Sequence, residues 1–175
     1  LRRYNVPEFV NDDPVQFPRR FRSLPDREIA ALLVSTISWG KRKMILANAE
    51  RLLAIMHHSP LDYTLSGQFE ELPRANIHRT FFTDNLRHYL RGLRLIYSRF
   101  GSLQAFAAHH HIAAAEMPAW ALAAAINSAI CEANDGCSDS RCLPANLDST
   151  ALKLLNMALR WLVRTAGIVD PGRWD

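Results

Sequence analysis

A helical spacing of apolar residues recurs through most of this chain, and it restricts the fold more than any other feature. The spacing is clearest between Asp84 and Gly101, where the apolar positions are Leu86, Tyr89, Leu90, Leu93, Ile96, Tyr97 and Phe100. Residues three and four positions apart lie on one face of a helix, so this segment is expected to be an amphipathic helix. No segment alternates apolar and polar residues for long enough to indicate a sheet. The sequence therefore predicts an all-α fold.

Other segments with the same spacing set the expected domain organisation. They run from Asp26 to Gly40, from Lys41 to about His57, through the alanine-rich residues 102–134, and from about Thr150 to Thr165. Residues 1–25 are rich in Arg, Asp, Asn and Pro without a helical period, which predicts an irregular N-terminal arm. We expect residues 26–175 to form a single helical domain. Because the chain ends directly after a strongly patterned helix, we expect it to be an incomplete fragment.

Composition narrows the class of protein. With 49% hydrophobic and 22% charged residues, the chain has the composition of a globular domain rather than of a disordered segment or a coiled coil. No apolar run reaches the roughly 18 residues of a membrane span, and no secretory leader is visible. The cysteines number three, and an odd count is typical of reduced thiols. We therefore expect a cytoplasmic protein without membrane contact.

The basic residues favour nucleic acid as a partner. The formal net charge is +4, and 18 of the 21 basic residues are arginines. The planar fork of arginine suits phosphate, so an arginine-dominated basic protein is a candidate for binding nucleic acid. A GC-rich genome that encodes arginine by default is an alternative explanation, and composition alone leaves both open.

Two short segments hold candidate anion contacts. In the expected turn between the first two helices, Trp39 precedes the cations Lys41, Arg42 and Lys43. Backbone amides at a helix start and cationic side chains bind anions readily, and the Trp39 ring could stack on a base. The alternative is that Trp39 belongs to the core and the cations are merely solvated. His78 and Arg79 form a second candidate, because adjacent His and Arg can clamp a phosphate, although capping and packing would explain them equally well.

Lys153 is the candidate nucleophile. Residues 148–150 can cap the last helix, which places Lys153 in or near its first turn. There the helix dipole disfavours an ammonium, so we expect the amine to lose its proton more easily and to suit Schiff-base chemistry. Asn156, Arg160 and Arg164 continue the same face at helical spacing. The alternative is an ordinary surface lysine.

The cysteines and a run of histidines invite a metal-binding interpretation. Cys131, Cys137 and Cys142 follow the run His109–His111 along the chain, and three thiolates with one imidazole would make a tetrahedral zinc site. However, the spacings match no paired-cysteine knuckle, and the histidines fall at the end of an alanine-rich helix. We therefore expect no metal and no cofactor.

Several segments together resemble an uncharacterised bacterial family known as domain of unknown function 2400. They span nearly the whole chain in the expected order and comprise Tyr4–Phe9, Asp13–Pro14, Asp26–Ala30, Trp39–Arg42, Ser59–Pro60, His78–Phe81, Lys153–Arg164 and Val169–Trp174. The family has no established activity, so this resemblance by itself implies no function.

A more distant resemblance, to the helix-hairpin-helix DNA glycosylases, implies a function on DNA. Trp39 falls where those enzymes often carry a glutamine that reaches into the duplex, and the loop before Lys153 is similar to their phosphate-binding hairpin. Lys153 lies where bifunctional members carry the lysine that attacks the sugar C1′. The resemblance implies a glycosylase-like helical fold, double-stranded DNA as partner, and base-excision or AP lyase activity. It assigns catalysis to Lys153 and contacts to Trp39, Arg42, His78, Arg79, Asn156, Arg160 and Arg164.

Some residues depart from the pattern of these relatives. The loop before Lys153 lacks their glycines, and Leu154 stands where the uncharacterised family tends to have arginine. The glycosylases also use an aspartate downstream of the lysine, beyond the reach of these 175 residues. We therefore expect the 175 residues to be catalytically inert. A non-catalytic DNA-binding module and a helical interaction domain unrelated to nucleic acid remain as alternatives.

Overall fold

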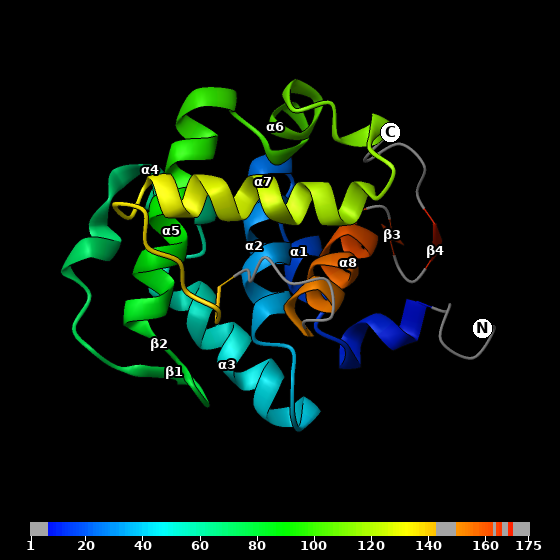
Figure 1. Ribbon diagram of the computed structural model, residues 1–175. Helices are drawn as coiled ribbons and strands as arrows, with labels where there is room; N and C mark the ends of the chain where they lie inside the picture. Colours follow the sequence, from blue (N-terminus) through cyan, green and yellow to red (C-terminus); the bar gives the residue numbers. More distant parts are fainter. Residues whose placement is uncertain (1–6, 143–149, 163, 166–167, 170–175) are drawn as a thin grey trace.

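A computed structural model describes residues 7–142, 150–162, 164–165 and 168–169, and this part of the chain is mostly helical, as predicted (Figure 1). The α-helices are α1 (Gln16–Arg19), α2 (Leu24–Thr36), α3 (Arg42–Ile55), α4 (Pro60–Ser66), α5 (Thr83–Phe100), α6 (Leu103–His109), α7 (Pro118–Glu132) and α8 (Thr150–Leu162). The 3-10 helices are η2 (Pro7–Asp12), η3 (Gln68–Glu71) and η4 (Ile112–Ala114). Two antiparallel pairs of very short strands complete it, β1 (Asn76–His78) with β2 (Phe81–Phe82) and β3 (Arg164–Thr165) with β4 (Ile168–Val169).

Helix α2 is the central element of the fold (Figure 1). Every residue from Glu28 to Ser35 is buried, and α1, α4 and α8 pack around the helix. The helix begins at Leu24, two residues before the expected start, because the Ser23 hydroxyl accepts a hydrogen bond from the backbone N of Asp26 at 3.3 Å. This central helix ends at the turn that carries Trp39, so the core fixes the position of that turn.

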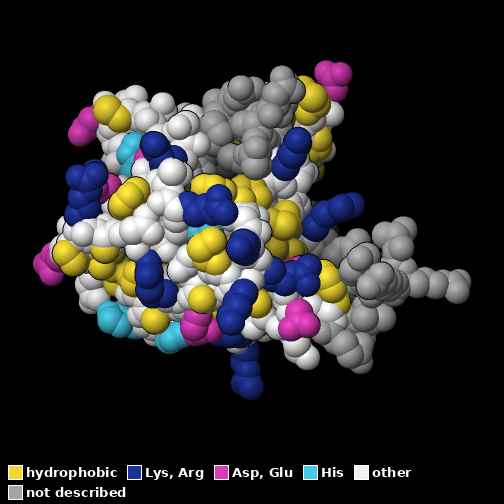
Figure 2. All heavy atoms as spheres, turned by 90° about the horizontal axis from the view of Figure 1, so that it is seen from below, with side chains coloured by type: hydrophobic (Ala, Val, Ile, Leu, Met, Phe, Trp, Pro, Cys, Tyr) yellow, Lys and Arg dark blue, Asp and Glu magenta, His cyan; other side chains and the backbone are white. Residues whose placement is uncertain are grey.

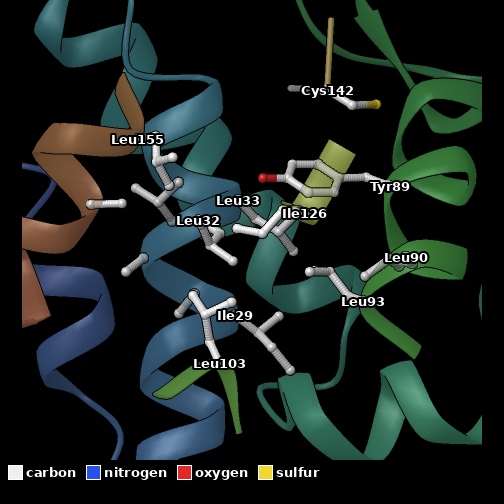
Figure 3. Packing of buried hydrophobic residues seen from close by; sticks show 14 of the residues in the cluster. Ile29, Leu32, Leu33, Tyr89, Leu90, Leu93, Leu103, Ile126, Cys142 and Leu155 are labelled. Atoms are coloured by element: carbon white, nitrogen blue, oxygen red, sulfur yellow. The ribbon is translucent and has the colours of Figure 1, made fainter. Parts of the chain in front are cut away.

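The amphipathic helix expected between Asp84 and Gly101 is confirmed as α5, which ends at a left-handed Gly101. Its apolar face is buried, and Figure 3 shows Tyr89 and Leu93 of α5 facing the side of α2 that carries Leu33. Apolar residues at helical spacing therefore form the core between α2 and α5, as predicted.

Helices α5 and α7 approach each other closely at Gly92. A Cβ added at Gly92 would lie 2.4 Å from Cγ1 and 2.7 Å from the Cα of Ile130. Such distances are well inside van der Waals contact, so this crossing requires glycine.

The arginines on the opposite face of α5 are mostly held by acidic and carbonyl partners. Arg91 donates to both carboxylate oxygens of Glu70, each at 2.6 Å, and these bonds lower the pKa of Glu70. Arg87 pairs with Asp84 and donates to the Leu72 carbonyl at 2.8 Å. Arg87 and Arg91 therefore join α5 to the segment before it. Because their guanidinium groups already have partners, they are less available to a phosphate.

A buried carboxylate connects α2 to the corner between α5 and α6. Glu28 is fully buried and accepts hydrogen bonds from the Tyr97 hydroxyl at 3.0 Å and from the backbone N of Leu103 at 2.7 Å. Its second oxygen accepts from the backbone N of Gln104 at 3.0 Å. A carboxylate is stabilised at a helix N-terminus, so Glu28 fixes where α6 begins.

The structure differs from the sequence-based expectation at the ends of the chain and in one connection. The segment expected to be irregular contains η2 and α1, and Val15 and Phe17 from it lie in the core. The last helix ends at Leu162, and Arg164 lies in β3 instead of continuing the helix. The β1–β2 hairpin was not expected, because strands of two or three residues leave no periodic signal.

Within the described ranges, no helix is both long and apolar enough to cross a bilayer.

Candidate nucleic-acid interface

Trp39 lies in the short turn between α2 and α3, and its side chain is half-buried. Its backbone N donates to the Ile37 carbonyl at 2.9 Å. The next residue, Gly40, has a φ of +110°, a conformation that favours glycine. A Cβ at Gly40 would also lie 2.9 Å from Nη2 of Arg79. The backbone of the turn therefore favours glycine, whereas a Cβ at this position would displace only the flexible end of the Arg79 side chain.

His78, on β1, is fully buried behind this turn. Its Nε2 is 2.9 Å from the Trp39 carbonyl oxygen, and its Nδ1 is 2.9 Å from Nδ2 of Asn48 on α3. A carbonyl accepts and an amide NH₂ donates, so the pattern fits the tautomer that carries its proton on Nε2. The ring also meets Trp39 edge-on, with 5.3 Å between centroids. His78 therefore acts on the site through Trp39 and is not exposed for the direct contact expected from sequence.

Arg79, at the tip of the β1–β2 hairpin, is exposed and stacks on Trp39. Its guanidinium carbon is 4.9 Å from the Trp39 ring centroid, within cation–π range. Its φ of +50° is left-handed, and Nδ2 of Asn76 donates to its carbonyl. Arg51 of α3 donates to the carbonyls of Asn76 and Ile77, the latter at 3.0 Å. These bonds hold the hairpin against α3 and so place Arg79 beside Trp39.

We define the basic face as Lys41, Arg42, Lys43, Arg51 and Arg79. All five side chains are exposed, and none forms an ion pair with another residue in the part of the chain that the structure describes. Figure 2 views the molecule from the side on which α3 and the β1–β2 hairpin lie, and lysine and arginine side chains are spread across that side. Lys41 and Lys43 are therefore available to an anionic ligand, whereas Arg51 is held by backbone carbonyls and Arg42 lies near the carboxylate of Asp13.

The N-terminal segment reaches the edge of the basic face. The Arg42 guanidinium lies 5.8 Å from the centroid of the Phe9 ring. Burial raises the pKa of Asp13, while a hydrogen bond from the Val15 backbone and the charge of Arg42 act against that rise. Residues of the expected N-terminal arm therefore help to position the first turn of α3.

A cavity of about 280 Å³ opens beside Trp39. It brings together the end of α2, the β1–β2 hairpin, the loop after α7 and helix α8. Its lining residues are Thr36, Trp39, Thr80, Phe81, Ser140, Arg141 and Leu154. The cavity is near the small end of ligand sites, which run from about 300 Å³ upward, and it combines aromatic walls with hydroxyl and guanidinium donors.

The loop after α7 forms one wall of this cavity. The sequence did not predict this contact. Asp139 accepts from Nδ2 of Asn85 at 2.5 Å and from the backbone N of Arg141 at 2.9 Å. Cys142 donates its thiol to the Asn85 carbonyl at 3.2 Å. An aspartate two residues before Arg141 is typical of an Asx turn, so the local shape of the loop could have been predicted. No feature of the sequence indicated that the loop contacts α5.

The three cysteines have different environments. Cys142 is buried, and burial raises its pKa well above the ordinary value, whereas Cys131 is half-buried and Cys137 is exposed. His109 instead stacks near Phe100, with 5.0 Å between ring centroids. Among the described residues, no three His, Cys, Asp or Glu side chains gather in an arrangement that could hold a metal ion.

Helix α8 carries the remaining candidate residues. Lys153, Asn156 and Arg160 are exposed, whereas Leu155 and Ala158 are buried in the core. Lys153 directly precedes Leu154, which lines the Trp39 cavity. The side chain of Arg164 and the expected hairpin before Lys153, residues 143–149, lie outside what the structure describes. The described residues thus bring Trp39, Arg141 and Leu154 of α8 to one cavity, while Arg79 stacks on Trp39 beside it.

A family model matches most of the chain. A model of the family described as "Protein of unknown function (DUF2400)" matches residues 13–175. The chain belongs to this family. The match includes all candidate site residues from Trp39 to Arg164, so the whole cavity lies within the family region. No curated protein and no solved structure matches the chain.

Proposed function

We propose that the protein binds double-stranded DNA through the basic face, with the Trp39 cavity at the contact. The observation that carries the proposal is the Trp39–Arg79 stack at the cavity that Trp39 lines. On the same face, Lys41 and Lys43 form no ion pair with any described residue. Cationic side chains bind the phosphate backbone, and an aromatic face or a guanidinium plane can stack on a base. The resemblance of the Trp39 turn to the glycosylase helix pair supports the same ligand.

The first test measures binding as a function of salt. A labelled duplex is titrated by fluorescence anisotropy with the wild-type chain and with the Lys41→Gln, Lys43→Gln double variant. The slope of log K against log salt is negative, and each lost phosphate contact makes it about 1 unit less steep, so we expect the double variant to be less steep by about 2. The charge-matched control is Arg20→Gln with Arg99→Gln, because both arginines are ion-paired in the fold.

The control should leave the slope close to the wild-type value. An equal decrease in both double variants would indicate a general charge effect and would contradict binding at the basic face. Wild-type protein that fails to bind duplex at low salt would overturn the proposal and favour a helical interaction domain.

AP lyase activity at Lys153 is a second candidate function, which rests on the resemblance to the glycosylases and on the exposed side chain of Lys153 on α8. In this reaction the neutral amine attacks the C1′ aldehyde of an abasic site, and water leaves as the imine forms. Water then takes up the C2′ proton, the C–H electron pair forms a C2′–C3′ double bond, and the C3′–O bond breaks so that the 3′ phosphate leaves with its electron pair. The imine later takes up water and frees the lysine.

Borohydride trapping tests this step, because it reduces the imine to a stable amine. Because the 175 residues are expected to be inert, trapping is carried out on the protein as its gene encodes it. There we expect a covalent adduct with an abasic duplex, no adduct with Lys153→Ala, and normal trapping with the control Arg99→Ala, because Arg99 pairs with Glu132 outside the basic face. Since the described cavity lining contains no carboxylate, we expect no release of damaged bases from an intact strand. DNA binding without any adduct would overturn the lyase assignment and leave a non-catalytic DNA-binding module.

A further inference from the structure

We propose that Arg141, on the loop after α7, binds a DNA phosphate at the edge of the Trp39 cavity. This inference rests on the proposed DNA binding and extends the interface beyond the basic face. It assigns a role to a residue that neither the motif pattern nor the charge pattern of the sequence indicated.

The guanidinium of Arg141 is available to a ligand because its acidic neighbour is already engaged. Nη1 of Arg141 is 4.0 Å from Oδ1 of Asp139, which is the outer limit of an ion pair. That same oxygen accepts from the backbone N of Arg141 at 2.9 Å, and the other oxygen of Asp139 accepts from Asn85. The carboxylate therefore holds the loop backbone, while the Arg141 side chain remains 54% exposed.

The loop presents Arg141 at a defined place. Two side-chain bonds anchor it to α5, from Asn85 to Asp139 and from the Cys142 thiol to the Asn85 carbonyl at 3.2 Å. Cys142 is buried, so the end of the loop is fixed in the core. A backbone that is ordered before binding loses less entropy on contact with a ligand, which favours a specific role for the side chain that it carries.

Arg141 and Trp39 line the same cavity, and Arg79 stacks on Trp39. The two arginines come from segments far apart in the sequence, the β1–β2 hairpin and the loop after α7. Arginine binds phosphate with two parallel N–H donors, which a single ammonium does not provide. Arg141 thus adds a phosphate contact on the cavity wall formed by the α7 loop.

The test compares salt slopes for three single variants on a duplex of about 20 base pairs, between about 0.05 and 0.2 M salt. Arg141→Gln should lower the affinity for the duplex about tenfold. It should also make the negative slope of log K against log salt less steep by about 1. Arg141→Lys keeps the charge, so its slope should equal that of the wild type. Its affinity should lie between those of Arg141→Gln and the wild type, because lysine lacks the two parallel N–H donors.

Arg99→Gln is the matched control. The Arg99 side chain is 55% exposed and pairs with Glu132 at 2.8 Å, so it resembles Arg141 in exposure. It lies 14 residues after Asn85 on α5, about 21 Å along the helix. We expect this variant to keep the wild-type slope. Circular dichroism should show the same helix content for all three variants.

The outcomes separate this inference from the proposed function. A less steep salt dependence for Arg141→Gln, with Arg99→Gln equal to wild type, supports the inference. If wild-type protein binds duplex but Arg141→Gln has the wild-type steepness, or differs from wild type no more than Arg99→Gln does, the inference is overturned and the proposed function stands. If wild-type protein binds no duplex, both fail.

Discussion

Glu28 illustrates how a single buried group is satisfied within this core and how it shapes its neighbours. It accepts from the Tyr97 hydroxyl and from two backbone amides at the start of α6. Burial, and then the charge of Glu28, raises the pKa of Tyr97 well above its ordinary value of 10.0. The folded state therefore holds Tyr97 in its neutral form.

This shift predicts a loss of stability in alkali. Because the pKa of Tyr97 is higher in the folded than in the unfolded state, its contribution is fully present below about pH 10 and is lost as the pH rises above it. Tyr97→Phe should cost about 0.5–1.5 kcal/mol at neutral pH, through the lost hydrogen bond, but should flatten the alkaline decline. Urea unfolding near pH 8 and pH 10.5 measures both effects. A variant as alkali-sensitive as the wild type would contradict this account.

Helices α5 and α7 can approach closely only because position 92 has no side chain. Gly92→Ala gains about 1 kcal/mol in helix propensity, but the added methyl group would overlap Ile130. Overpacking costs about 1–3 kcal/mol, so we expect a net loss of stability of up to about 2 kcal/mol. Thermal unfolding checks this result. Ser98→Ala, on the exposed side of the same helix, is the control and should not destabilise. A Gly92→Ala protein more stable than wild type would show that the helices can separate freely.

The elements also show what could be predicted from sequence. The long helix α5 was predicted because its apolar residues repeat over several turns, and α3 was predicted between Lys41 and about His57 for the same reason. The β1–β2 hairpin and α1 were not predicted, because elements of two to four residues are too short to show a periodic pattern. Phe17 of α1 is buried in the core only because distant segments pack against it.

The same distinction applies to the candidate site. Its local part, Trp39 with Lys41–Lys43, follows from neighbouring residues in the sequence. Arg79 was singled out as a phosphate contact, but its stacking on Trp39 depends on a hairpin held by Arg51. Arg141 joins the cavity through Asp139 and Asn85, which are 54 residues apart, and no local pattern carries such a contact.

For the whole molecule, the arrangement around α2 predicts where the fold is most resistant to opening. Helices α1, α4 and α8 cover α2, whereas Arg42, Lys43 and Met44 at the start of α3 are exposed. In native-state hydrogen exchange, amides of Ile29–Val34 should exchange last, at the rate set by global unfolding. The first turn of α3 should exchange much sooner. Equal protection of both regions, measured by mass spectrometry or NMR, would contradict a fold built around α2.

The contact between Gly40 and Arg79 also constrains how related sequences can diverge. Any side chain at position 40 would have to adopt a left-handed backbone and would meet the guanidinium that rests on Trp39. Homologues that keep the stacked arginine are therefore expected to keep glycine at position 40. A side chain there would strain the turn and push the flexible end of Arg79 off the Trp39 ring.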